Sequence, residues 1–174
     1  EDDDGLIRLP QGVLALTDGR TATRRAVEDI HDDLVLLDLT LDFGAATAIA
    51  VAPAMGCSSA ALTAATGLLR AAGLAPHVVA DTPGLVVMRI VSMLVNESCD
   101  AVLQGVCDAR GVDTAMRSGV NYPLGPLAWA DRVGADTILT VLNHLQQGYG
   151  SDRYRPSLLL QQHVYAGRAF HETD

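Results

Sequence analysis

The chain has 174 residues, 49% of them hydrophobic, and a formal net charge of −9 at pH 7. This length and apolar content suffice for one ordinary domain, or two small ones, with a packed core. All twelve basic residues are arginines and they form no cluster, so we expect neither nucleic acid nor an acidic membrane surface as a partner.

The sequence holds no apolar run of membrane-spanning length, and its acidic start, EDDDG, lacks the basic and apolar regions of a signal peptide. We expect that start to be a frayed tail or a linker. Cys57, Cys99 and Cys107 are an odd number without a C-x-x-C pair, which favours free thiols over a disulfide framework or a zinc site. These features predict a cytoplasmic location.

Residues 6–81 alternate between strand-like and helix-like segments. Short β-branched or leucine-rich runs predict strands at 12–18, 33–39, 46–52 and 76–81. The alanine- and leucine-rich segment 57–73 predicts a helix whose first serines can cap free N–H groups, and a shorter helix is expected over 21–29. Because strand, helix and strand in succession indicate a parallel crossover, we expect a small α/β layer with a parallel sheet.

From Pro83 onward the sequence predicts helices only. A long helix is expected over 81–106, with Asp81 or Thr82 as its cap and Pro83 in its first turn. Segments that end in glycine predict further helices at 112–119, 126–134, 135–148 and 157–167. The expected organisation is an α/β domain over residues 1–82 and an all-α domain over residues 83–174.

Polar side chains recur along the long helix. Arg89, Asn96 and Gln104 lie seven and eight residues apart, so they project along one stripe, with Ser92 and Asp100 nearby. The residues expected to cover the remaining surface are apolar: Leu85, Val87, Ile90, Leu94 and Val95. This pattern alone favours a solvated stripe or a row of interhelical hydrogen bonds over a ligand site.

Four segments of the second half form a linked series of motifs. They are DTPGLVVMRI (81–90), NESCDAVLQGV (96–106), VDTAMRSGVNYPLGPLAWADRVG (112–134) and DRYRPSLLLQQHVYAG (152–167). In this order and at these distances they resemble the C-terminal helical domain of the 3-hydroxyacyl-CoA dehydrogenases, over about residues 76–168. The resemblance implies that the joint Tyr122–Pro126 sets two helices across each other, with Trp129 filling the angle.

The resemblance is most specific to the long bacterial 3-hydroxybutyryl-CoA dehydrogenases of phenylacetate breakdown, whose chains carry a second, degenerate copy of the dehydrogenase. It implies that residues 6–82 are a reduced Rossmann fold. It also implies that the full-length protein uses NAD to oxidise a 3-hydroxyacyl-CoA to a 3-oxoacyl-CoA. For this segment it implies a helical domain that closes over the acyl-CoA substrate and forms a homodimer.

The sequence departs from the family pattern where the chemistry would occur. AIAVAPAMG (48–56) stands where a complete copy has its catalytic histidine, and neither that histidine nor its glutamate is present. A dinucleotide needs a glycine-rich turn between strand and helix, whereas LALTDGRTATRRA (14–26) offers Gly19 followed by Arg20. Asn96 matches a family asparagine beside the substrate thioester. Apart from this retained position, we predict no catalytic, cofactor-binding or metal-binding residue in this segment.

Other sites are less well supported. Ser58, Ser59, His77 and Asp81 are close in sequence, but serine nucleophiles need an oriented base and usually a G-x-S-x-G turn, so the serines are better explained as helix caps. Surface or packing roles are expected for His31, His77, His144, His163 and His171. No cluster has the spacing of metal ligands. The alternative hypothesis is a non-catalytic dimerisation or scaffold module without ligand contact; residual acyl-CoA affinity would separate the two hypotheses.

Overall fold

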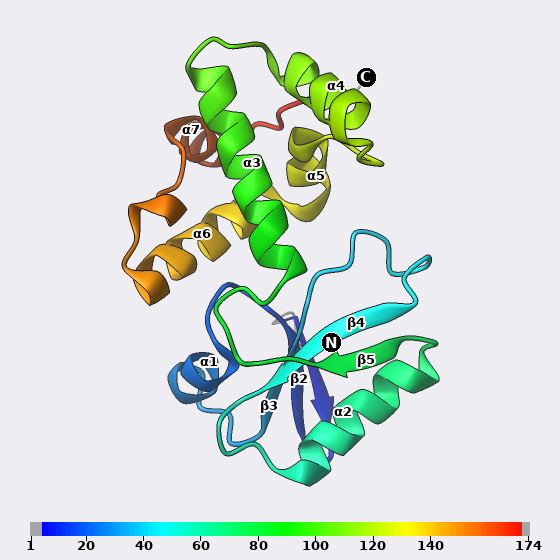
Figure 1. The fold of residues 1–174 in the computed structure, drawn as a ribbon. Coiled ribbons are helices and arrows are strands. Elements are labelled where there is room, and N and C mark those ends of the chain that lie inside the picture. Colours follow the sequence, from blue (N-terminus) through cyan, green and yellow to red (C-terminus); the bar gives the residue numbers. More distant parts are fainter. Residues whose placement is uncertain (1–4, 172–174) are drawn as a thin grey trace. The chain divides into compact units, whose positions relative to one another are not determined.

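The structure, a computed structural model, describes residues 5–171 and divides into two compact units, Glu1–Met88 and Arg89–Asp174 (Figure 1). The acidic tail predicted at residues 1–4 lies outside the described residues. The expected fold class is confirmed, because an α/β part is followed by helices alone. The domain boundary between residues 82 and 83 remains a prediction.

The first unit is a five-stranded sheet with two helices. Its elements are β1 (Leu6–Leu9), β2 (Gly12–Leu16), α1 (Ala22–Glu28), β3 (Leu34–Leu37), β4 (Ala48–Pro53), α2 (Ser59–Ala71) and β5 (Ala75–Val78). The strands lie side by side in chain order. The four predicted strands and both predicted helices are present, and β1 is an additional strand that pairs with β2 in antiparallel register.

The expectation of a wholly parallel sheet is wrong. Strands β2 and β3 are parallel, as are β4 and β5, because α1 and α2 carry the chain back between them. Strands β3 and β4 are antiparallel, with Leu36 opposite Ala52, since the connection 38–47 contains no crossover helix. The predicted parallel crossover is therefore confirmed only within each strand–helix–strand unit.

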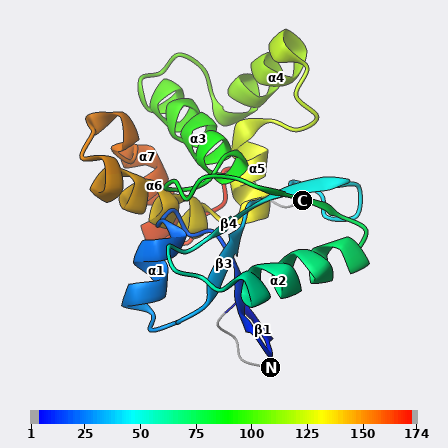
Figure 2. The same ribbon diagram turned by 60° about the horizontal axis from the view of Figure 1, so that its bottom comes forward.

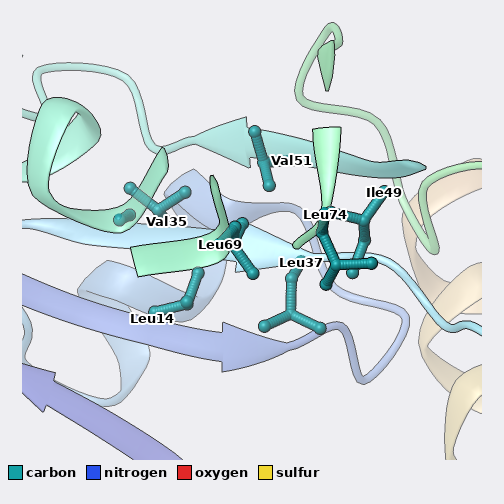
Figure 3. Close-up of a cluster of buried hydrophobic side chains, with 8 residues drawn as sticks. Leu14, Val35, Leu37, Ile49, Val51, Leu69 and Leu74 are labelled. Atoms are coloured by element: carbon teal, nitrogen blue, oxygen red, sulfur yellow. The ribbon is translucent and has the colours of Figure 1, made fainter. Parts of the chain in front are cut away.

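The two faces of the sheet are covered by different helices, α2 on one side and α1 on the other (Figure 2). The α2 side gathers larger aliphatic side chains (Figure 3): Leu14, Val35, Leu37, Ile49, Val51, Leu69 and Leu74. The α1 side buries Ala15, Ala22, Ala26, Leu34, Leu36, Ala52, Ala54 and Leu85. Because β3 is buried on both faces, its sequence LVLL is a continuous apolar run.

Helix α3 (Val87–Leu103) begins several residues after the predicted start. Gly84 and Leu85 have φ values of +69° and +49°, which a right-handed helix does not allow. The predicted cap, Asp81, instead accepts hydrogen bonds from the backbone N–H groups of Ala22 and Thr23. The predicted capping arrangement is therefore wrong.

Asp38 binds the first N–H groups of α3 from a position directly after β3. Its carboxylate accepts hydrogen bonds from the N–H groups of Val86, Val87 and Met88 at 2.9, 2.7 and 3.0 Å. The side chain is only 1% exposed. Since the first N–H groups of a helix have no partner within the helix, this distant carboxylate supplies it.

The second unit contains the rest of α3 and four further α-helices. These helices are α4 (Ala109–Val120), α5 (Pro126–Val133), α6 (Ala135–Tyr149) and α7 (Leu158–Ala166), with a 3-10 helix, η1 (Asp152–Tyr154), before α7. The joint between α4 and α5 follows the prediction. Asn121 ends α4 in the left-handed region, Pro126 opens α5, and Trp129 is buried with its ring centroid 5.4 Å from that of Tyr122.

Candidate functional site

The start of α1 is where a dinucleotide-binding fold holds the cofactor phosphates on free N–H groups. In this chain, the N–H groups of Ala22 and Thr23 donate to the Asp81 carboxylate at 2.6 and 2.9 Å. The Thr23 hydroxyl donates to the same carboxylate at 2.7 Å, and the Thr21 hydroxyl accepts from the N–H of Arg24. The anion at this helix start is therefore a side chain of the protein itself.

Arg20, which follows the single glycine of this turn, is held by three carboxylates. Its guanidinium lies 2.6 Å from Asp18, 2.9 Å from Glu28 and 2.8 Å from Asp29. Burial raises the pKa of Asp18, but the hydrogen bonds from Arg20 and the charge of Arg25 outweigh it, so this pKa lies below its ordinary value. Hydrogen bonds from Arg20 also lower the pKa of Asp29. The Arg20 charge is thus neutralised internally.

Replacing Arg20 with glutamine should make the chain less stable at pH 7 and less sensitive to acid. A carboxyl whose pKa is lowered in the folded state adds stability above its ordinary pKa, and this contribution is lost as the pH falls through the folded value. Asp18 and Asp29 should give this loss between about pH 5 and pH 2 in the unchanged chain, and the loss should be smaller in the variant, where Arg25 alone of the two arginines still faces them. Urea unfolding at several pH values measures it. An Arg70→Gln control should keep the original pH slope, and an unchanged slope in Arg20→Gln would contradict the assignment.

Residues 54–56, directly after β4, carry no side chain that could accept a proton from a substrate hydroxyl. Ala54 is buried, Met55 is 88% exposed, and Gly56 follows. Ser58 caps α2, accepting a hydrogen bond from the N–H of Ala61 at 3.2 Å, as predicted, whereas Ser59 is the first residue of the helix rather than a cap. Residues 54–56 therefore supply no base, and the absence of a catalytic residue from the segment as a whole remains a prediction.

Asn96 joins α3 to the segment that leads into α7. Its side-chain amide donates to the carbonyl oxygen of Arg155 at 3.0 Å, and its amide oxygen accepts from the N–H of Ser157 at 2.7 Å. Asn96 is 2% exposed and Ser92, one turn earlier, is fully buried. Both the amide nitrogen and the amide oxygen of Asn96 therefore bond to the protein backbone. At this position the polar stripe serves hydrogen bonding within the protein.

The rest of the predicted stripe does not form one seam. Gln104 lies beyond the end of α3 and is exposed, whereas Asn96 faces the interior. The expectation that apolar residues bury the remaining surface of this helix is wrong at Ile90, which is 52% exposed. Gln104 therefore does not belong to the same helical row as Asn96, because α3 ends at Leu103.

Replacing Asn96 with alanine should destabilise the chain by about 2 kcal/mol, because the buried N–H of Ser157 and the carbonyl of Arg155 would both lose their partner. Urea unfolding followed by circular dichroism measures this loss. Asn143, exposed on α6, provides the matched control, and its replacement should change stability by less than about 0.5 kcal/mol. Equal effects of the two replacements would show that the hydrogen bonds of Asn96 do not stabilise the fold.

A groove of about 640 Å³ lies in the second unit, between α3 and η1. The residues that line it are Arg89, Ile90, Met93, Leu94, Glu97, Arg153 and Tyr154. Tyr154 stacks on Tyr149 with ring centroids 5.0 Å apart, and the Arg89 guanidinium donates to the Tyr149 hydroxyl oxygen at 3.1 Å. The sequence did not indicate this groove, because its two sides are more than fifty residues apart in the chain.

Residues 5–171 contain no group of three or more His, Cys, Asp or Glu side chains arranged to hold a metal ion. In that same part of the chain no helix has the length and apolar character needed to cross a membrane. The three cysteines are free thiols. Burial, followed by the nearby Asp100 charge, raises the pKa of Cys99 to about 12. Because the thiolate is the nucleophilic form of cysteine, Cys99 is suited to packing rather than to nucleophilic chemistry.

Comparison with protein families assigns both halves of the chain. The 3-hydroxyacyl-CoA dehydrogenase C-terminal domain matches residues 84–174, and the 3-hydroxybutyryl-CoA dehydrogenase reduced Rossmann-fold domain matches residues 14–83. Among curated relatives, 3-hydroxyadipyl-CoA dehydrogenase of Escherichia coli is 38% identical over 91% of this chain and 32% of that protein. A probable 3-hydroxybutyryl-CoA dehydrogenase of Deinococcus radiodurans is 45% identical over 50% of this chain and 31% of that protein.

Solved structures agree with this assignment. A 3-hydroxybutyryl-CoA dehydrogenase from Escherichia coli K12 has a TM-score of 0.88 and 36% identity, covering 95% of this chain and 34% of that one. A (S)-3-hydroxybutyryl-CoA dehydrogenase from Ralstonia eutropha has a TM-score of 0.77 and 25% identity, covering 92% of this chain and 60% of that one. The chain spans about a third of the length of the curated relatives that it matches. It belongs to the 3-hydroxyacyl-CoA dehydrogenase family.

Proposed function

We propose that this chain is the C-terminal part of an NAD-dependent 3-hydroxyacyl-CoA dehydrogenase, which as a whole oxidises 3-hydroxyacyl-CoA to 3-oxoacyl-CoA. The two family matches support this, as do relatives described as 3-hydroxyadipyl-CoA and 3-hydroxybutyryl-CoA dehydrogenases. We extend the proposal to a cytoplasmic location, which the free thiols favour, and to phenylacetate or fatty acid breakdown as its setting.

Within that enzyme, this segment supplies a helical domain for substrate closure and subunit association rather than hydride transfer. The observation that carries this proposal is the Asp81 carboxylate on the first N–H groups of α1. A second anion placed there would meet a negative charge instead of free donors, so the residues present do not fit the phosphates of NAD. Arg20 offers no compensation, because three carboxylates already hold it.

The proton-transfer side supports the same proposal. A general base must lie within hydrogen-bond reach of the substrate hydroxyl, and the three residues directly after β4 are Ala54, Met55 and Gly56. His171 binds the Asp113 carboxylate at 2.8 Å, and the His163 ring stacks on Phe170 with centroids 4.1 Å apart. We assign both histidines to packing of the C-terminal segment, and Asn96 to bracing α3 rather than to ligand contact.

The direct test is an assay of this chain with 3-hydroxybutyryl-CoA and NAD, following NADH absorbance. The proposal predicts no rate above that of buffer, whereas a full-length dehydrogenase of the family tested beside it should turn over. Measurable turnover by the chain would show that it holds a complete site. Acyl-CoA affinity in the full-length protein then distinguishes substrate closure from a scaffold that contacts no ligand.

We also propose a homodimer through the helical half. Helix α7 has the sequence LLLQQHVYA, yet only Leu160 in it is buried, while Leu158 is 56% and Tyr165 is 80% exposed. Large apolar side chains that are exposed together on one helix face normally mark a contact surface. These two side chains lie seven residues apart, so they share one face.

Replacing both Leu158 and Tyr165 with glutamate should therefore convert a dimer into a monomer at about 10 μM, because two charges would have to be buried at the contact. Sedimentation velocity gives the state of each form. Val120→Glu, which changes an equally exposed apolar residue on α4, should leave the dimer intact. A chain that sediments as a monomer before any replacement, even at high concentration, would contradict the dimer.

A further inference from the structure

The floor of the groove between α3 and η1 is aliphatic. Ile90, Met93 and Leu94 lie three and four residues apart on α3, so their side chains form one strip along the helix. Ile90 stays 52% exposed, although moving a β-branched aliphatic side chain out of water lowers the free energy. A volume of about 640 Å³ with an apolar floor is within the range of small-molecule sites.

Two guanidinium groups bring positive charge to this floor. Arg89 donates to the Tyr149 hydroxyl oxygen, and within residues 5–171 it forms no ion pair with a carboxylate. The Arg153 guanidinium has no carboxylate partner within residues 5–171. The side-chain hydroxyl of Ser151 accepts a hydrogen bond from the backbone N–H of Arg153, not from its guanidinium. By contrast, Arg155, two residues later, lies 3.6 Å from Asp100.

The groove also has one acidic residue, Glu97, two helical turns after Arg89. In the described part of the chain Glu97 forms no ion pair with either guanidinium, so it does not cancel their charge by direct contact. The site therefore has an apolar strip with a cationic rim, and two planar donors suited to a carboxylate or a phosphate.

We propose that this groove binds a small amphipathic anion, an aliphatic chain that ends in a carboxylate or a phosphate. The chain lies along Ile90, Met93 and Leu94, and the anionic end meets Arg89 and Arg153. Tyr154 forms a side wall that its stacking on Tyr149 keeps in place. This assignment uses only the groove, so it does not rest on the proposed dehydrogenase activity.

Calorimetry on the 174-residue chain with octanoate, octyl phosphate and octan-1-ol tests the proposal. Octanoate or octyl phosphate should bind at least about tenfold more tightly than the alcohol, because a charge-assisted hydrogen bond is about twice as strong as a neutral one. The ratio between the two anions tells whether a carboxylate or a phosphate is preferred. Arg89→Gln and Arg153→Gln should each weaken anion binding about tenfold.

The matched control is Arg110→Gln, on α4, which should leave the affinity for octanoate unchanged. Octanol binding as tightly as octanoate, or an unaltered affinity in Arg153→Gln, would overturn the proposal. So would an absence of anion binding together with a dimer that Ile90→Glu converts into a monomer, since the groove would then be a contact between copies of the chain. None of these measurements involves NAD, so their failure leaves the dehydrogenase assignment intact.

Discussion

Replacing Asp38 with alanine should destabilise the chain by about 3 kcal/mol, because one buried and two partly buried backbone N–H groups at the start of α3 would lose their acceptor. These donors, on Val86, Val87 and Met88, lie 2.7–3.0 Å from the carboxylate. Asp38 itself is 1% exposed, so water cannot readily replace it. Urea unfolding or thermal melting measures the loss, which corresponds to a fall in Tm of about 6–12 °C.

A matched replacement separates this role from a general effect of removing an aspartate. Asp42 is exposed, and its carboxylate accepts hydrogen bonds from the neighbouring N–H groups of Gly44 and Ala45. Asp42→Ala should therefore cost less than about 1 kcal/mol. Asp38→Asn, which keeps an acceptor but loses the charge, should fall between the two. Equal losses for Asp38→Ala and Asp42→Ala would show that α3 does not depend on this cap.

Replacing Gly125 with alanine should also destabilise the chain by about 3 kcal/mol, through overpacking at the joint between α4 and α5. An added methyl group would overlap the carboxyl group of Asp113. That carboxylate cannot move aside freely, because it accepts hydrogen bonds from the N–H groups of Leu127 and Ala128 at 2.9 and 3.0 Å. Gly125 has an ordinary φ of −74°, so the requirement is for space rather than for backbone freedom.

Gly119 provides the control for this prediction. It lies within α4 and an added methyl group there meets nothing within 4 Å, so Gly119→Ala should stabilise the chain by about 0.5–1 kcal/mol. The double replacement Gly125→Ala with Asp113→Gly should be less destabilising than the sum of the single changes, because the overlap disappears. Strict additivity would contradict the proposed clash.

The sequence allowed correct prediction of most elements whose pattern is local. The helix over 57–73 was predictable from its composition and its serine cap, and the joint before Trp129 from Pro123, Gly125 and Pro126. The start of α3 was not predictable, because Asp81 and Pro83 are typical of a helix start. The cap in the structure is Asp38, some fifty residues away in the chain. A cap that is supplied across the fold leaves no sign in the adjacent sequence.

The relative direction of β3 and β4 could not be predicted from the sequence either. Alternation of strands and helices predicts parallel pairs, but β3 and β4 follow each other without a helix, and only the folded chain shows that they run antiparallel. At the candidate site, the sequence itself shows that no histidine stands in AIAVAPAMG (48–56), whereas the absence of a catalytic residue remains a prediction. The contact of Asp81 with the start of α1 could not be predicted, because Asp81 follows Ala22 and Thr23 by 59 and 58 positions in the chain.

We propose that this segment holds no nicotinamide cofactor, because the Asp81 carboxylate already occupies the first N–H groups of α1, where the cofactor phosphates would bind. Calorimetric titration of NAD into the chain tests it most directly, with a full-length 3-hydroxybutyryl-CoA dehydrogenase as the positive control. We expect no heat beyond dilution for the chain up to about millimolar NAD, and clear binding by the control. Micromolar affinity of the chain for NAD would contradict the account.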